Sequence, residues 1–212
     1  MTTAIEHRAP ALREWAVIYE AVLRGEQIVD LRKGGIHETG KHFTLRAPRF
    51  WLYPGYEHQR ADLLKPEYLP ALDRVLARTP PEGVIRIEGW AELVATAELS
   101  DADLVAALDR EFIWTRDYAE QRLRWKPKHA LHLLVLRAYR LAEPLEVPWR
   151  EQYRGCTSWA ELVDLPADPA AIPSRPVLDE QQFRRRYDRL RALLPAGALQ
   201  PVRQTAEAGP DR

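Results

Sequence analysis

Helical and extended patterns follow one another irregularly along this chain, and their order constrains the fold more than any other feature. Apolar spacing and capping residues predict helices over residues 12–23, 66–78, 100–108, 115–125, 158–165 and 179–194. Short apolar or alternating segments predict strands over residues 27–33, 42–52, 84–88, 90–97 and 129–141. Because the helices interrupt the strands without a regular βαβ rhythm, we expect an α+β fold rather than a doubly wound parallel sheet.

The length of 212 residues suits one domain, or one domain with a helical appendage. Apolar residues make up 46% of the chain, which is enough for a sizeable core. We expect an α+β barrel domain over residues 1–165. A Pro- and Ala-rich linker and a docked Arg-rich helix then follow over 166–195, and a disordered tail without apolar pattern over 196–212.

The composition excludes several classes of protein. Equal numbers of basic and acidic residues, 31 of each, exclude a wholly basic nucleic-acid coat, so attraction to phosphate requires local patches. The single Cys156 cannot form an intrachain disulfide, and no Cys/His spacing suits zinc. No apolar run approaches the roughly 20 residues that span a bilayer, and residues 1–13 lack the apolar core of a signal peptide. We therefore expect a cytoplasmic protein with no membrane partner, no metal and no cofactor.

A first candidate site lies at the end of the strand predicted over residues 27–33. Arg32 and Lys33 precede Gly34 and Gly35, whose backbone amides can approach an anion, and His37 follows. Such a segment suits phosphate, although it lacks the Gly-Lys-Ser/Thr order of a P-loop. The alternative is an ordinary strand exit with solvated cations.

A second candidate site is the aromatic stretch over residues 49–59. A nucleobase could stack on Tyr53 or Tyr56 while His58 or Gln59 binds its polar edge. The alternative is an aromatic plug that closes one end of a barrel.

A third candidate site combines tryptophans with cations over residues 113–128. Between residues 116 and 128, five cations face two acidic residues. Trp114 and Trp125 could stack with bases while Arg124, Lys126 and Lys128 contact phosphate. The alternative is a solvated amphipathic helix whose tryptophans point inward.

Two other classes of function remain open at this point. Glu20, Asp30 and His58 could form a metal-dependent nuclease or hydrolase site, although Arg32 stands where such nucleases offer a carboxylate to the metal. A protein partner could bind the Arg-rich helix over residues 179–194. Cys156 between Gly155 and Thr157 is more typical of a buried structural cysteine than of a nucleophile.

Several of these segments also resemble a known family. Residues 14–17, 31–36, 53–59, 114–115, 125–128 and 155–159 resemble a bacterial family labelled as domain of unknown function 1802, which implies no activity. Residues 20–32, 84–97 and 131–148 are more distantly similar to ASCH domains of the PUA-like superfamily, with Glu26, Gln27 and Asp30 departing from the usual residues.

The ASCH resemblance implies a small bent β-barrel with surrounding helices and a C-terminal helix. It also implies a cleft that binds RNA or modified bases. Together with the three candidate sites, it leads us to expect a module without catalysis that binds RNA, DNA or a nucleotide on one common groove.

Overall fold

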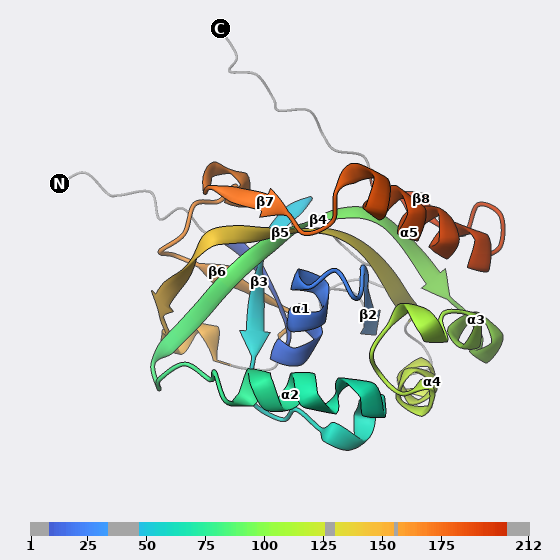
Figure 1. The fold of residues 1–212 in the computed structure, drawn as a ribbon, viewed down its shortest axis with the longest axis horizontal. Helices are drawn as coiled ribbons and strands as arrows, with labels where there is room; N and C mark the ends of the chain where they lie inside the picture. The colour runs from blue at the N-terminus through green and yellow to red at the C-terminus, as the bar shows by residue number, and fades with distance from the viewer. Residues whose placement is uncertain (1–8, 34–46, 126–129, 155–156, 203–212) are drawn as a thin grey trace, which may run out of the picture.

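The computed structural model describes residues 9–33, 47–125, 130–154 and 157–202, and Figure 1 shows their arrangement. Within these ranges, eight strands form one mixed sheet in the order β2-β5-β4-β3-β1-β6, with β7 on β5 and β8 on β4. β1 and β3 pair in parallel, whereas the other pairs are antiparallel. The strands are β1 Ala9–Trp15, β2 Val29–Lys33, β3 Arg49–Gly55, β4 Val84–Leu99, β5 Leu131–Pro148, β6 Trp159–Leu162, β7 Ser174–Pro176 and β8 Gln200–Pro201.

Two long strands give the sheet its curvature. β4 and β5 pair from Val84 and Pro148 at one end to Leu99 and Leu131 at the other, with shifts of register after Ile87 and after Leu93. Such irregularities bend a strand and increase its twist. The sheet therefore curls into a half-barrel, and the described parts of β2 and β6, at its two ends, do not pair with each other. The prediction of an α+β fold with a strongly bent sheet is confirmed.

In the described residues, five α-helices accompany the sheet: α1 Ala16–Leu23, α2 Leu69–Leu76, α3 Ala102–Ala107, α4 Arg116–Arg124 and α5 Glu180–Leu193. Asp101, Thr115 and Asp179 cap α3, α4 and α5 through their side chains, and Asp179 forms a capping box with Gln182. None of the helices in the described ranges is long and apolar enough to cross a membrane.

Helix α1 lies within the curve of the sheet (Figure 1) and is apolar on almost every side. Seven of its eight residues are buried, and the exception is Glu20. A helix that is apolar all round belongs in a core. The single carboxylate on α1 therefore marks the place where this helix faces a cleft instead of the interior.

Gly89 allows the end of α1 to approach the sheet closely. A Cβ atom on this residue would lie 2.5 Å from the Leu23 side chain and 2.5 Å from the backbone oxygen of Tyr139. The glycine sits at a register shift of β4, which is a usual place for close backbone approach. The chain leaves α1 at Gly25, whose φ of +70° suits glycine.

Several predicted elements differ from the structure. The helix predicted over residues 12–23 begins only at Ala16, because residues 9–15 pair with β3 and β6 as a strand. The strands predicted over 84–88 and 90–97 are one strand, β4, with an irregularity at Gly89 instead of a break. The helix predicted over 158–165 is wrong, since Trp159–Leu162 form strand β6.

The segment after α5 also differs from its prediction. Gln200 and Pro201 pair with Thr96 and Ala95 of β4, and Leu199 is buried in the core. The prediction of disorder from residue 196 is therefore wrong as far as residue 202, and the rest of that tail lies outside the described residues. The chain from 166 to 195 does hold the predicted helix, α5, whose Phe183 and Leu190 pack into the main core.

Candidate functional site

An open cleft lies between α1, α2 and the adjoining parts of β3 and β4. Its walls are apolar where α1, β3 and α2 meet, through residues such as Leu23, Leu52 and Val75. Side chains with polar atoms line the rest: Tyr19, Glu20, Tyr56, Arg78, Arg86 and Glu88. Small-molecule sites combine an apolar lining with a few polar groups in this way.

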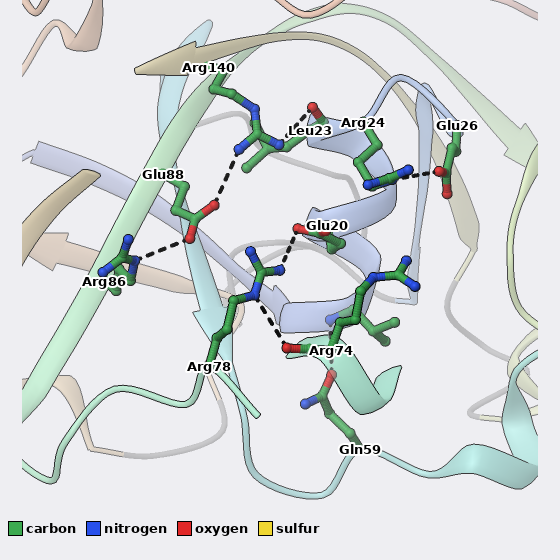
Figure 2. A network of polar contacts seen from close by, with 11 residues as sticks. Glu20, Leu23, Arg24, Glu26, Gln59, Arg74, Arg78, Arg86, Glu88 and Arg140 are labelled. Atoms are coloured by element: carbon green, nitrogen blue, oxygen red, sulfur yellow. Dashed lines mark hydrogen bonds and ion pairs between the residues drawn. The ribbon is translucent and has the colours of Figure 1, made fainter. Parts of the chain in front are cut away.

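An ion pair links the two helices beside the cleft. A guanidinium nitrogen of Arg78, which follows α2, lies 3.1 Å from a carboxylate oxygen of Glu20 on α1 (Figure 2). The Glu20 side chain is 10% exposed and that of Arg78 is 53% exposed. The carboxylate is therefore held in the wall, whereas the arginine lies over it from the solvent side.

A second carboxylate, Glu88 on β4, is held by two arginines (Figure 2). Arg86 lies 3.2 Å from one of its oxygens and Arg140 lies 3.3 Å from the other. Arg140 also donates a hydrogen bond to the backbone oxygen of Leu23 at the end of α1, at 3.0 Å. This arrangement fixes the orientation of Glu88 and ties the end of α1 to β5.

Tyr56 is the more accessible of the two tyrosines that line the cleft, since Tyr19 is buried. Tyr56 directly follows β3 and is half-buried. Burial raises the pKa of its hydroxyl, and the nearby carboxylate of Glu88 raises the pKa further. The phenol is therefore neutral at pH 7 and can donate a hydrogen bond.

Gln59 lies at the start of α1, close to the cleft (Figure 2). Its side-chain oxygen accepts a hydrogen bond of 2.9 Å from the backbone N–H of Val17, in the first turn of the helix. This N–H is one that a helix cannot satisfy itself. Gln59 therefore fastens the loop after β3 to α1, and its amide oxygen is already in use.

The cleft brings together only part of the predicted nucleic-acid surface. Tyr56 lines it, and Gln59 supports it from the adjoining loop. Glu20, predicted as a weak catalytic candidate, is a wall residue. His58 lies on the same loop, but its side chain is 87% exposed and is 4.0 Å from Glu57, which is also exposed.

Arg32 lies in the interior and not at a solvated strand end. Its side chain is 8% exposed, and Nε lies 2.8 Å from Asp30 while Nη2 lies 3.2 Å from Glu14. Nη2 also donates to the backbone oxygen of Arg13 at 2.7 Å. Burial raises the pKa of Asp30 to about 6 against the opposing effect of Arg32. These contacts engage the guanidinium within the protein, so its placement does not support a phosphate contact.

Two of the predicted stacking residues are also buried. Trp114 is 0% exposed in the main core, and Tyr53 is 6% exposed with the guanidinium of Arg13 4.5 Å above its ring. For Trp114 the structure matches the alternative of an inward-facing tryptophan, and for Tyr53 it matches a packing role at the curled end of the sheet.

The remaining predicted residues gather around the end of α4. Lys33 donates to the backbone oxygen of Leu123 at 2.5 Å, Arg124 pairs with Glu120 at 2.9 Å, and Trp125 is 55% exposed. None of these three lines the cleft. His37, Lys126 and Lys128, like Cys156, lie outside the described residues.

The proposed nuclease residues do not form a metal site. Among residues 9–33, 47–125, 130–154 and 157–202, no group of three or more His, Cys, Asp or Glu side chains is placed to hold a metal ion. Glu20 pairs with Arg78, Asp30 pairs with Arg32, and His58 lies on an exposed loop. The described residues therefore do not bring these three side chains together as a metal site, and the nuclease or hydrolase alternative stays a prediction.

The sequence analysis missed three cleft residues: Arg78, Arg86 and Glu88. A signal was present for two of them, because Arg86 and Glu88 alternate with the buried Ile85 and Ile87 and must share one face of β4. Arg78 gave no comparable signal, since it follows a helix and reaches the cleft only through the packing of α2 on α1.

The family of the chain follows from a comparison with family models. The sequence matches the model described as "Domain of unknown function (DUF1802)" over residues 11–189. The chain belongs to this family. The resemblance that residues 14–17, 31–36 and 53–59 carry is thereby confirmed.

Solved structures of ASCH proteins are also similar to this DUF1802 chain. A mutant of the ASCH protein from Zymomonas mobilis is 13% identical with a TM-score of 0.42, covering 86% of this chain and 96% of its own. The crystal structure of ASCH from the same organism gives 13% identity and a TM-score of 0.42, with 86% and 95% covered. The predicted similarity to ASCH domains is therefore found. No curated protein matches the chain.

Proposed function

We propose that the cleft beside α1 binds an unpaired nucleotide, either free or within a single strand of RNA. The observation that carries this proposal is the lining itself. Two tyrosines, of which Tyr56 is the more accessible, lie with two guanidinium groups and two carboxylates around an apolar wall. These groups suit the parts of a nucleotide: a ring can stack on the flat base, guanidinium groups can bind the phosphate, and carboxylates can accept hydrogen bonds from donors on the edge of the base.

Tyr56 suits the base. Proteins that bind single strands stack successive bases on aromatic side chains, and each stacked base contributes about 1–3 kcal/mol. Tyr56 is half-buried, so that its position is restricted while part of the side chain remains accessible in the cleft. The neighbouring Leu52 and Leu23 extend an apolar surface beside it.

Arg78 and Arg86 suit the phosphate. Their side chains are 53% and 39% exposed, and both line the cleft. Binding of a single strand weakens with a slope of about −0.7 in log K against log salt for each phosphate contact. Two contacts therefore predict a slope of about −1.4, which is shallower than the slope of a protein with an extended basic surface.

The recessed position of Tyr56 in the cleft favours unpaired nucleotides over duplexes. A base inside a duplex can enter such a pocket only after it is unstacked and unpaired, at a cost of a few kcal/mol. We therefore expect tighter binding to a single-stranded RNA oligomer than to the same sequence in a duplex. Free nucleoside monophosphates test whether the base and one phosphate are sufficient.

Fluorescence anisotropy with labelled single-stranded RNA tests the proposal. Tyr56→Ala should weaken binding by about 5- to 150-fold, the equivalent of one stacked base, whereas Tyr56→Phe should retain most of the affinity. Arg86→Gln should weaken binding and reduce the salt slope by about 0.7.

Matched controls lie outside the cleft. Tyr187→Ala removes a half-buried tyrosine from α5, and Arg154→Gln removes an exposed arginine paired with Glu151 at 3.0 Å. Neither should change the affinity if Tyr56 and Arg86 form the site. Absence of binding to RNA, DNA and free nucleotides, or equal losses in the cleft and control variants, would contradict the proposal.

A further inference from the structure

The two carboxylates of the cleft restrict which base can bind there. An ionised carboxylate accepts hydrogen bonds and cannot donate them. Glu20 is 10% exposed and Glu88 is 21% exposed, so each is largely removed from water. A ligand that displaces an arginine from either carboxylate must therefore offer donors in its place, because a buried charge without a partner is strongly unfavourable.

Of the two carboxylates, Glu20 is the one that can accept hydrogen bonds from a ligand. Glu88 is already held on both oxygens by Arg86 and Arg140. In the described part of the chain, Glu20 has one ion-pair partner, Arg78, whose side chain is 53% exposed and therefore able to move. A ligand can replace Arg78 at Glu20 without disturbing the core.

We infer that Glu20 selects guanine as the base bound in the cleft, an inference that depends on the nucleotide site proposed above. Guanine carries two adjacent donors on its Watson–Crick edge, N1–H and the N2 amino group. Their spacing matches the two oxygens of one carboxylate, which is the bidentate geometry that gives the strongest hydrogen bonds. Unpaired bases are commonly recognised on this edge.

The other common bases fit Glu20 less well. Adenine and cytosine each place an acceptor nitrogen beside their single amino group, and that acceptor would face a carboxylate oxygen. Uracil offers one N–H between two acceptor oxygens. Only guanine satisfies both oxygens of Glu20 without placing a second acceptor against them.

The same exchange keeps Arg78 paired. When the guanine edge occupies Glu20, the guanidinium of Arg78 is released toward the open side of the cleft. There it can bind the phosphate of the same nucleotide, since arginine is well suited to phosphate. Glu20 thus exchanges the cation for two neutral hydrogen-bond donors, and Arg78 exchanges the carboxylate for the phosphate.

Isothermal titration of the wild-type protein with GMP, IMP and AMP tests this selection. IMP is GMP without the N2 amino group, so it loses one hydrogen bond to a charged group. GMP should bind about 10-fold or more tightly than IMP, and AMP should bind more weakly than GMP by a similar or larger factor. A single-stranded oligomer with one guanine, compared with its inosine and adenine versions, shows whether the preference also holds in RNA.

Two glutamate variants locate the preference. Glu20→Gln offers one acceptor and one donor, so the ratio of GMP to IMP affinity should approach one. Glu26→Gln, which changes a carboxylate outside the cleft that pairs with Arg24, should keep the wild-type ratio. Thermal unfolding of both variants shows whether they are folded.

The outcomes separate this inference from the proposed function. Equal affinities for GMP, IMP and AMP in the wild-type protein would overturn the guanine selection while leaving nucleotide binding intact. A guanine preference that persists in a folded Glu20→Gln protein would also overturn it. Failure of every nucleotide and oligomer to bind would instead overturn the proposed function. The comparison of GMP with IMP needs no variant, so it decides the matter even if Glu20→Gln does not fold.

Discussion

Replacing the buried Arg32 with methionine should destabilise the fold severely. Methionine retains much of the length of the side chain but removes the charge. Asp30, whose side chain is 0% exposed, and Glu14, whose side chain is 8% exposed, would then lose the cation that lies 2.8 Å and 3.2 Å from them. The backbone oxygen of Arg13 would lose a donor at 2.7 Å.

The expected magnitude follows from the burial of this group. Removing one partner of a buried ion pair destabilises a protein by about 3–5 kcal/mol, because an uncompensated charge remains inside. For a chain of this length, that corresponds to a melting temperature lower by about 6–20 °C. The loss should shrink near pH 5, because burial raises the pKa of Asp30 to about 6 and a protonated Asp30 no longer requires a counter-charge.

Urea unfolding followed by tryptophan fluorescence measures the effect, since Trp51 and Trp114 are fully buried. The matched control is Arg24→Met, which removes an equally short ion pair, 2.7 Å from Glu26, whose side chains are 48% and 32% exposed. That exposed pair should contribute less than about 1 kcal/mol. An Arg32→Met protein within about 1 kcal/mol of the wild type would refute this interpretation of the buried cluster.

Two further predictions concern the framework of the cleft and its pH dependence. Gly89→Ala should lower the free energy of unfolding by about 1–3 kcal/mol or more, because the new Cβ would lie 2.5 Å from a backbone oxygen. Gly55→Ala is the control: its new Cβ would lie 3.4 Å from the nearest atom, so the effect in the same urea assay should be smaller. Folding raises the pKa of Asp30 from 3.8 to about 6, so the folded state binds this proton more tightly than the unfolded state does. The free energy of unfolding should therefore increase by up to about 3 kcal/mol as the pH falls from above 6 to 4. Asp30→Asn should lack this increase, and an identical pH profile in both proteins would show that Asp30 has no such role.

Local chemistry made parts of the fold predictable. Asp179 and the apolar spacing from Phe183 to Leu190 marked α5, and the structure shows the cap and the buried face that this pattern indicates. The strand over 27–33 and the α2 region were likewise visible, because their periodicity is a property of neighbouring residues. These elements depend little on the rest of the chain.

Long-range packing decided the features that the sequence concealed. Residues 12–15 share the apolar spacing of the helix that follows, but pairing with β3 and β6 makes them part of a strand. Arg32 follows an apolar residue at what looked like a strand exit, yet the fold buries it beside Asp30 and Glu14. Partners distant in sequence determine both outcomes, so spacing alone could not reveal them.

In the candidate site, too, some residues could be predicted from local sequence and others only from long-range packing. Tyr56 and Gln59 stood out because aromatic and amide groups cluster after β3, and both lie at or beside the cleft. Arg78 and Glu20 meet only because α2 packs against α1, across 58 positions of sequence. The pairing of these two residues required the structure.

Amide chemical shifts of the isotope-labelled protein, recorded while GMP or a short single-stranded RNA is added, show directly where a nucleotide binds. The largest changes should fall on residues that surround the cleft, including Leu23, Leu52, Tyr56 and Glu88. Changes confined to the end of α4 near Trp125, or no changes at millimolar nucleotide, would contradict a nucleotide site beside α1.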